Sequence, residues 1–336
     1  MVRLIAVFVA LLSLAVPAAA EEVNVYSGRH YDGDQILYDA FTKKTGITVN
    51  VLSAPSEEIL QRLIIEGKRS PADVLITVDA GNLWRAETGG VLQPITSALL
   101  TARVPANLRD PKGYWFGLAT RARVIVRRKG DPSTANVKSY ADLADPKYKG
   151  KVCVRKSSAI YNLSLLAAMI GHDGAARAES WVKGVVANFA RPPQGADTDQ
   201  IMGVGTGECA LAISNHYYWL RLLKSSVAAE HDAAAKAEIV FPDQAGRGTH
   251  VNISGAGVVA GAPHKANAIK FLEFLVSDEA QAYFAHGNYE FPVVSTATLD
   301  PDLKAIGPFK IDPINVRTYG ENQVQAQEIF DRAGWK

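Results

Sequence analysis

The sequence predicts an α/β protein with two lobes, and three observations support this prediction. Short apolar β runs alternate with amphipathic helical stretches, a pattern typical of α/β architecture with mainly parallel sheets. The chain has 336 residues, which is more than a single compact core usually holds. The extended run at 118–126 has no helix close behind it, so we expect it to cross from the first lobe to the second and to form part of the hinge.

Three β-α units are expected at the start of the first lobe. The predicted strands are 23–27, 48–52 and 73–78, and the predicted helices begin near residue 34 and span 56–66. Helical spacing places two sets of apolar side chains on core-facing stripes, namely Ile36, Leu37, Ala40 and Phe41 on the first helix and Ile59, Leu60, Leu63 and Ile64 on the second.

The second lobe is expected to contain strands around Val152 and Cys209, each followed by a helix. Val251 to Val259 is a plausible return strand, and helices at 266–276 and 279–285 are expected to pack back on the first lobe. The expected division is lobe one at 21–118 plus about 258–290 and lobe two at 119–257. Residues 291–336 are left without a lobe, although a final helix is expected at 323–333.

The first twenty residues have the features of a secretory signal peptide. Arg3 precedes an apolar stretch from Leu4 to Val16, and small residues end at Ala20, so cleavage is expected before Glu21. The apolar stretch is too short to serve as a stable membrane anchor. We therefore expect a periplasmic protein.

The overall charge excludes some classes of partner. The chain carries 36 Lys and Arg against 34 Asp and Glu, and these charges are not gathered into a basic stripe. Nothing in this balance predicts nucleic-acid binding or attachment to a membrane surface. A monomer is expected.

Two cysteines, Cys153 and Cys209, each lie in an apolar, strand-like run. In an oxidising compartment their pairing is the default expectation, and a disulfide bond would join two neighbouring strands. Two buried free thiols are the alternative. A redox role is disfavoured because the chain has no C-x-x-C motif.

Aromatic and imidazole side chains follow three predicted strands, at the point where a helix begins. These segments hold His30 and Tyr31, then Tyr161, then Tyr217 and Tyr218. Open α/β sheets bind ligands at the carboxyl ends of their strands, so a cleft between two lobes could bring the segments together. Each segment alone is better explained by ordinary packing or loop residues, and it is the position shared by all three that favours a site.

Several phenols in one site favour a hard, highly charged cation. Keeping a phenol of pKa near 10 ionised at neutral pH costs about 4 kcal/mol, and four phenols cost about 16 kcal/mol. Calcium and magnesium recruit carboxylates and carbonyls instead. Ferric iron fits best on charge and hardness, with Fe2+ as an alternative that would tolerate fewer ionised tyrosines.

The whole chain after residue 20 resembles the periplasmic ferric-iron-binding proteins of the FutA/FbpA type. The resemblance is carried by several motifs: Tyr26-Ser-Gly-Arg-His30-Tyr31, Ser158-Ala-Ile-Tyr161-Asn162 and Asn215-His-Tyr217-Tyr218. It implies a type II periplasmic-binding-protein fold, in which two α/β lobes are joined by hinge strands. It also implies that the protein is not an enzyme and that its partner is the permease of an ABC importer.

The resemblance implies metal ligands at Tyr217 and Tyr218. Members of the FbpA type complete the site with a histidine, a carboxylate and an anion, whereas members of the FutA type use further tyrosines. Tyr31 and Tyr161 favour the second arrangement, and the resemblance leaves open whether His30 coordinates the metal. Arg29 and Arg221 are candidates to lie behind the ligands and balance phenolate charge.

Two other functions stay open on the sequence alone. A receptor for an oxyanion could use the helix start at Ser157, and a receptor for an organic cation could use the aromatic side chains as a cage. A secreted metalloenzyme is disfavoured because neither H-E-x-x-H nor G-x-S-x-G occurs.

Overall fold

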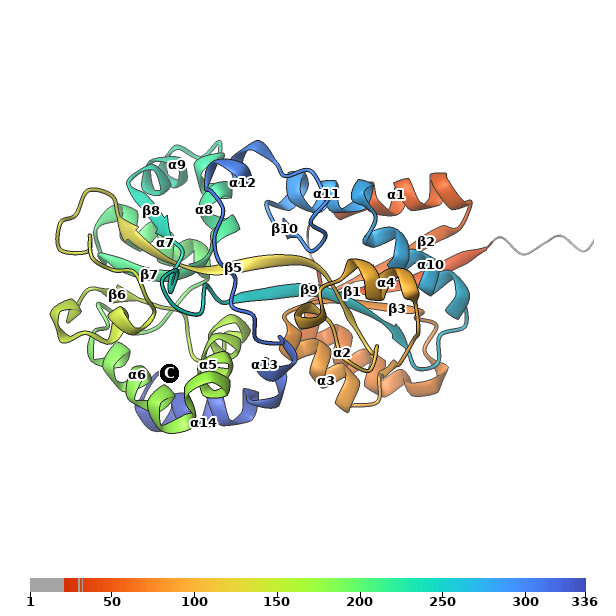
Figure 1. Cartoon of the computed structure of the whole chain (residues 1–336), viewed down its shortest axis with the longest axis horizontal. Coiled ribbons are helices and arrows are strands. Elements are labelled where there is room, and N and C mark those ends of the chain that lie inside the picture. Colours follow the sequence, from red (N-terminus) through yellow and green to blue (C-terminus); the bar gives the residue numbers. More distant parts are fainter. Residues whose placement is uncertain (1–20, 30, 32) are drawn as a thin grey trace, which may run out of the picture.

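The computed structural model describes residues 21–29, 31 and 33–336. The expected signal peptide and His30 therefore lie outside the described residues. Figure 1 shows two lobes side by side, each with a sheet between layers of helices.

The lobe drawn on the right in Figure 1 is built on a group of strands in the order β2-β1-β3-β9. β4 and the first half of β5 both pair with β9 on the side opposite β3. The bounds of these strands are β1 (Glu22–Ser27), β2 (Thr48–Ser53), β3 (Val74–Val78), β4 (Leu92–Gln93), β5 (Phe116–Arg128), β9 (Val251–Val259) and β10 (Phe291–Pro292). β10 pairs with β5.

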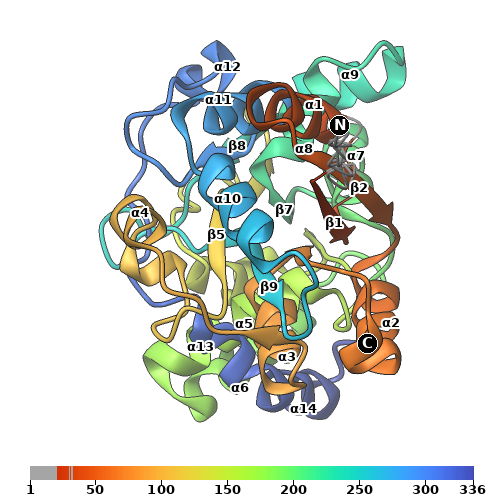
Figure 2. The same ribbon diagram turned by 90° about the vertical axis from the view of Figure 1, so that its right-hand side faces the viewer.

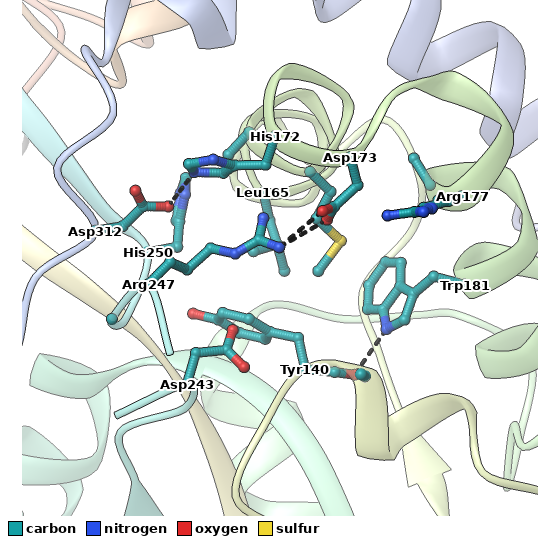
Figure 3. Close-up of a pocket in the computed structure, with 15 residues that line it drawn as sticks. Tyr140, Leu165, His172, Asp173, Arg177, Trp181, Asp243, Arg247, His250 and Asp312 are labelled. Carbon is teal, nitrogen blue, oxygen red and sulfur yellow. Dashed lines mark hydrogen bonds and ion pairs between the residues drawn. The ribbon is translucent and has the colours of Figure 1, made fainter. Parts of the chain in front are cut away.

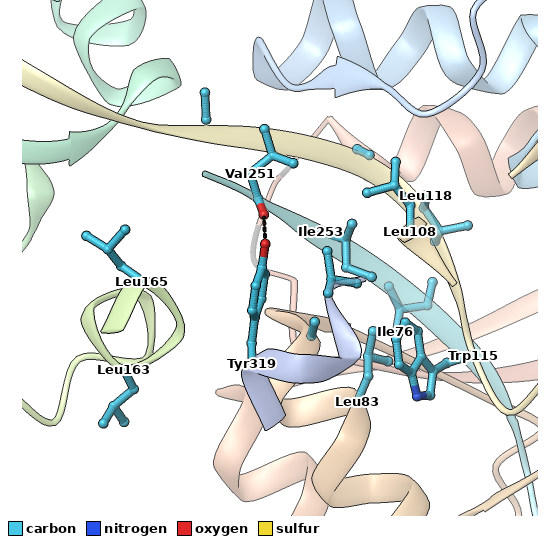
Figure 4. Close-up of a cluster of buried hydrophobic side chains, with 14 of the residues drawn as sticks. Ile76, Leu83, Leu108, Trp115, Leu118, Leu163, Leu165, Val251, Ile253 and Tyr319 are labelled. Carbon is cyan, nitrogen blue, oxygen red and sulfur yellow. Dashed lines mark hydrogen bonds between the residues drawn. The ribbon is translucent and has the colours of Figure 1, made fainter. Parts of the chain in front are cut away.

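Helices cover both faces of this sheet. In the side view of Figure 2, α1, α10 and α11 lie on one face, and α2 and α3 lie on the other. Their bounds are α1 (Asp34–Thr45), α2 (Ser56–Glu66), α3 (Ala80–Thr88), α4 (Ala98–Arg103), α10 (Lys265–Leu275) and α11 (Asp278–Asn288). Figure 4 shows the apolar core under the sheet, where Ile76, Leu83 and Trp115 pack together.

The second lobe is built on the other half of β5, with β6 (Val152–Cys153), β7 (Leu211–Asn215) and β8 (Ala237–Val240). Its helices are α5 (Ile160–Asp173), α6 (Ala175–Ala187), α7 (Asp197–Thr206), α8 (His216–Leu223) and α9 (Ala228–Ala235), and a 3-10 turn, η3 (Ala141–Ala144), precedes them. Cys153 and Cys209 form a disulfide bond, with their Cα atoms 5.9 Å apart, which ties β6 to the residues that lead into β7.

The C-terminal segment runs along both lobes. It contains α12 (Pro301–Ala305), α13 (Arg317–Glu321) and α14 (Gln323–Ala333). α13 packs between α3 and α5, and α14 packs on α5 and α6. Tyr319 of α13 is fully buried, and its hydroxyl donates to the carbonyl of Val251 at 2.9 Å (Figure 4).

Two sequence-based expectations are wrong. Among the described strands, six of the nine pairings are antiparallel, because the long strands β5 and β9 run against their neighbours. Ile36 and Ile64 were expected to face the core, but they are 52% and 47% exposed. The stripes on α1 and α2 are therefore narrower than the apolar pattern predicted.

Candidate functional site

Four tyrosines from three separate segments lie together between the two lobes. Tyr31 follows β1, Tyr161 lies in the first turn of α5, and Tyr217 and Tyr218 lie in the first turn of α8, directly after β7. The hydroxyls of Tyr31 and Tyr217 are 3.4 Å apart, although 186 residues separate them in sequence. The rings of Tyr217 and Tyr218 have centroids 4.3 Å apart.

Tyr161 completes this group from the second lobe. Its phenol is close enough to act electrostatically on Tyr31, Tyr217 and Tyr218. The predicted tyrosines are thus brought together at strand ends, where the sequence pattern expected them.

Burial raises the pKa of Tyr31, Tyr217 and Tyr218. Tyr217 is fully buried and Tyr161 is 8% exposed. Burial is the largest cause of the raised pKa values of Tyr31, Tyr217 and Tyr218, and mutual repulsion among the tyrosines adds to it. Without a cation between them these phenols are protonated at neutral pH, so the group can take up a metal ion by releasing protons.

Arg29 and Arg221 both lie against the tyrosine rings. The guanidinium carbon of Arg29 is 4.6 Å from the ring centroid of Tyr31. That of Arg221 is 4.7 Å from the ring of Tyr31 and 4.8 Å from the ring of Tyr217. Both arginines therefore lie where their positive charge would stabilise phenolates, if these form.

Arg29 belongs to a buried ion network that the sequence analysis missed. Its guanidinium pairs with Asp34 at 2.7 Å and with Glu290 at 2.9 Å. Glu290 also accepts a hydrogen bond from Ser254 at 2.8 Å and lies 3.4 Å from Arg121, which is itself almost fully buried. The network joins the loop after β1 to the hinge strands β5 and β9.

Three further arginines surround the ring of Tyr161. The guanidinium carbons of Arg121, Arg123 and Arg155 lie 5.2 to 5.7 Å from its centroid. Asp197 accepts hydrogen bonds from both Arg123 and Arg155. One signal could have identified two of these arginines, because positions 121 and 123 interrupt a mostly apolar run that was expected to cross between the lobes.

The arginines around the tyrosines have buried hydrogen-bond donors that lack a partner. Among the described residues, buried nitrogens without a partner include Nη1 of Arg29 and the Nε atoms of Arg121, Arg123 and Arg155. Buried donors are normally satisfied, so their concentration around the tyrosines indicates a place for added negative charge.

Two neighbouring residues have structural roles. His216 points away from the tyrosines: its Nε2 lies 2.8 Å from the carbonyl of Tyr289, and its Nδ1 accepts from the backbone N–H of Ala122. Asp79 caps α3 and accepts hydrogen bonds from Ser164 of α5 at 2.6 Å and Asn252 of β9 at 2.8 Å. Asp79 therefore links the two lobes beside the site.

The described residues contain no group of three or more His, Cys, Asp or Glu side chains that could hold a metal ion. Nor does any helix within 21–29, 31 and 33–336 have the length and apolar character needed to cross a membrane.

Comparisons with known proteins agree with this architecture. A family model described as bacterial extracellular solute-binding protein matches residues 37–309. Iron uptake protein A1 of Synechocystis sp. is 47% identical over 95% of this chain and 89% of its own length.

Two solved structures are similar in both sequence and shape. Trichodesmium IdiA (FutA) in complex with iron and citrate has a TM-score of 0.92 and 51% identity, covering 94% of this chain and 100% of that one. Apo FutA2 from Synechocystis has a TM-score of 0.90 and 45% identity, covering 95% of this chain and 100% of that one. With a family model over most of its length and full-length relatives at this identity, the chain belongs to the bacterial extracellular solute-binding proteins, as a FutA/FbpA-like member that is not an enzyme.

Proposed function

We propose that this protein binds ferric iron in the cleft between its lobes and delivers it to an ABC importer. The proposed ligands are Tyr31, Tyr161, Tyr217 and Tyr218, and His30 is a further candidate. The carrying observation is that these four phenols, from three distant segments, gather among buried arginines. The relatives named for iron uptake and for iron and citrate support the same cargo.

The charges around the cleft support a trivalent ion. Each phenolate formed at neutral pH costs about 4 kcal/mol, more when burial raises its pKa, and a hard trivalent cation can offset that cost. Four phenolates and one Fe3+ leave one negative charge, which Arg29, Arg121 and Arg221 are placed to stabilise. Fe2+ would leave a second negative charge, so we propose it as a weaker cargo.

Closure of the lobes would complete the site. We take lobe one as 21–118 plus about 258–290, lobe two as 119–257, and residues 291–336 as a segment that contacts both. Tyr31 then belongs to one lobe and the other three tyrosines to the other. Iron favours the closed form because only that form brings the four phenols to one ion. The permease subunits would recognise the closed form.

The proposed cellular location and partners rest on the same family membership. We propose a periplasmic monomer, exported with cleavage of residues 1–20, whose direct partners are the importer's transmembrane subunits and the ferric ion.

Iron-dependent colour tests the proposal. Purified protein loaded with Fe3+ should show a phenolate-to-iron charge-transfer band in the visible spectrum, and Tyr217→Phe should lose most of that band and bind iron at least tenfold more weakly, as expected for the loss of a charged ligand. Tyr148→Phe is a matched control, because Tyr148 is also buried but its hydroxyl has no partner among the described residues. An unchanged band in Tyr217→Phe would contradict the proposal. A colourless protein that instead binds an oxyanion or an organic cation in the cleft would favour those alternatives.

A further inference from the structure

A second pocket lies in the second lobe, at the opposite end of α5 from Tyr161. It has a volume of about 240 Å³ and is enclosed by α5, α6, η3 and the loop before β9 (Figure 3). Tyr161 lies in the first turn of α5, whereas His172 and Asp173, which line this pocket, lie in the last. None of the tyrosines of the iron site lines it.

Apolar and aromatic side chains form most of the wall. Leu165, Ala168 and Met169 present one side of α5, and Trp181 of α6 and Tyr140 supply aromatic groups. The indole N–H of Trp181 donates to the backbone carbonyl of Tyr140 at 2.7 Å, which fixes the indole in place (Figure 3). A pocket with this lining suits an organic molecule with an apolar body.

An ion pair and a histidine–carboxylate hydrogen bond engage most of the charged groups of the pocket. The guanidinium of Arg247 lies 2.8 and 3.0 Å from the two carboxylate oxygens of Asp173. Nε2 of His172 lies 2.7 Å from a carboxylate oxygen of Asp312. These groups hold each other across the pocket, as Figure 3 shows, and so they are already matched.

Asp243 is the carboxylate left without a cationic partner. Among the described residues no Lys, Arg or His side chain forms an ion pair with it, and Arg247 pairs with Asp173 instead. Burial raises the pKa of Asp243 to about 6, and Asp142 and Asp312 add to this effect while Arg247 opposes it. Its backbone has φ of 59°, a left-handed conformation that non-glycine residues seldom adopt. Burial thus makes ionisation of Asp243 unfavourable, and its left-handed backbone is a conformation that few residue types adopt.

His250 supplies a second unmatched polar group in the same wall. It is 3% exposed, and its Nδ1 has no hydrogen-bond partner among the described residues. Burial is the main cause of a pKa of about 3, so the ring is neutral at physiological pH. A buried polar atom of this kind normally has a protein or ligand partner.

We propose that this pocket binds a small organic ammonium ion with an apolar or aromatic body, whose positive group meets Asp243 and His250 and whose body lies against Trp181, Tyr140 and α5. An ammonium ion would give Asp243 its missing counter-ion and favour its ionised form. The faces of Trp181 and Tyr140 would add cation–π attraction.

The charge of the pocket argues against other occupants. Three carboxylates, from Asp173, Asp243 and Asp312, line the pocket with two guanidinium groups, from Arg177 and Arg247, so the carboxylates are in excess by one. An anionic ligand would meet this excess. The described residues also offer no group of three or more His, Cys, Asp or Glu side chains that could hold a metal ion.

Three matched probes test the proposal on the iron-free, full-length protein. 2-Phenylethylamine has the ammonium group and the apolar body, 2-phenylethanol replaces the charge with a hydroxyl, and phenylacetate reverses the charge. Titration calorimetry at pH 7.5 should give the amine about tenfold tighter binding than the alcohol, as expected for a charged hydrogen bond, and no measurable binding of phenylacetate. Equal binding of amine and alcohol, preference for phenylacetate, or no binding of the amine would overturn the proposal.

Two variants locate the site. Asp243→Asn removes the charge and keeps a side chain that tolerates the left-handed backbone, so it should bind the amine about as weakly as the wild-type protein binds the alcohol. Met169→Phe keeps every charge and fills the cavity, so it should also lose the amine. Asp232→Asn changes an exposed carboxylate of the same lobe and should bind the amine normally. Normal binding in either pocket variant, with a native circular dichroism spectrum, would refute the assignment. Iron affinity is measured separately, so failure here leaves the proposed iron site untouched.

Discussion

Glu290 offers a sharp test of how charge is balanced behind the tyrosines. Its side chain is fully buried and contacts Arg29 at 2.9 Å, Ser254 at 2.8 Å and Arg121 at 3.4 Å. Burial alone would raise its pKa, but Arg29 and Arg121 hold the pKa below its usual value. Its contribution to stability is therefore present above the ordinary carboxylate pKa and is lost as the pH falls through the lower folded pKa.

Glu290→Gln should destabilise the iron-free protein by about 3 to 5 kcal/mol, because Arg29 would keep only Asp34 as an ion-pair partner and Arg121 would lose the carboxylate with which it pairs among the described residues. Iron loading should reduce this loss by at least about 1 kcal/mol, since the phenolates that iron creates supply new negative charge beside the same arginines. Urea denaturation at pH 7.5, with and without bound iron, measures both values.

Glu238→Gln is the matched control. Glu238 also pairs with an arginine, Arg127 at 2.8 Å, but this pair is partly exposed and should contribute less than about 1 kcal/mol. The reasoning fails if Glu290→Gln costs no more than this control, or if its cost is the same in the iron-free and iron-loaded protein.

Three other changes have definite expected outcomes. Ser164→Ala removes the 2.6 Å hydrogen bond to Asp79 between the lobes, which should destabilise the closed form by about 1 to 2 kcal/mol. In competition with a chelator, the variant should therefore retain iron about tenfold less strongly. Unchanged retention would contradict the interlobe role of this hydrogen bond. Asp243→Asn should stabilise the protein at pH 7.5 by about 1 kcal/mol after allowance for solvent screening, because the folded pKa of about 6 exceeds the unfolded value. The gain should shrink as the pH falls through 6 and vanish below about pH 3, where the carboxyl is protonated in both the folded and the unfolded protein. Thermal unfolding across pH measures this gain, and a loss of stability at pH 7.5 would contradict it. Reduction of the Cys153–Cys209 bond should lower the free energy of unfolding by about 2 to 4 kcal/mol, and a double Cys153→Ala, Cys209→Ala variant should lose the response to reductant.

Local patterns predicted the helices and strands well. The predicted helix at 56–66 coincides with α2, and the predicted strand at 48–52 lies within β2. These elements depend on neighbouring residues, which the sequence displays directly. The direction of strand pairing depends on contacts between residues far apart in sequence, so the antiparallel pairing of β5 and β9 could not be predicted from local patterns.

The tyrosine group could be predicted for a similar reason. Tyr31, Tyr161 and Tyr217 each follow a recognisable strand, and the carboxyl ends of strands in α/β lobes are where ligands bind. The buried network could not be predicted in full. Glu290 lies two residues beyond the end of α11 in a segment with no periodic pattern, and only its tertiary contacts with Arg29 and Arg121 make it part of the site.

Because β5 is one continuous strand through both lobes, the backbone that joins the lobes also carries residues that contact the ring of Tyr161. Its first half belongs to one sheet and its second half to the other, and Arg121 and Arg123, where the pairing passes from β9 to β7, flank the ring of Tyr161. A rotation of one lobe must twist the strand there and shift the guanidinium groups relative to the phenol. The backbone about which the lobes would rotate thus carries the arginines that contact Tyr161. A substitution that makes this part of β5 more flexible should therefore also change how strongly the protein binds its cargo.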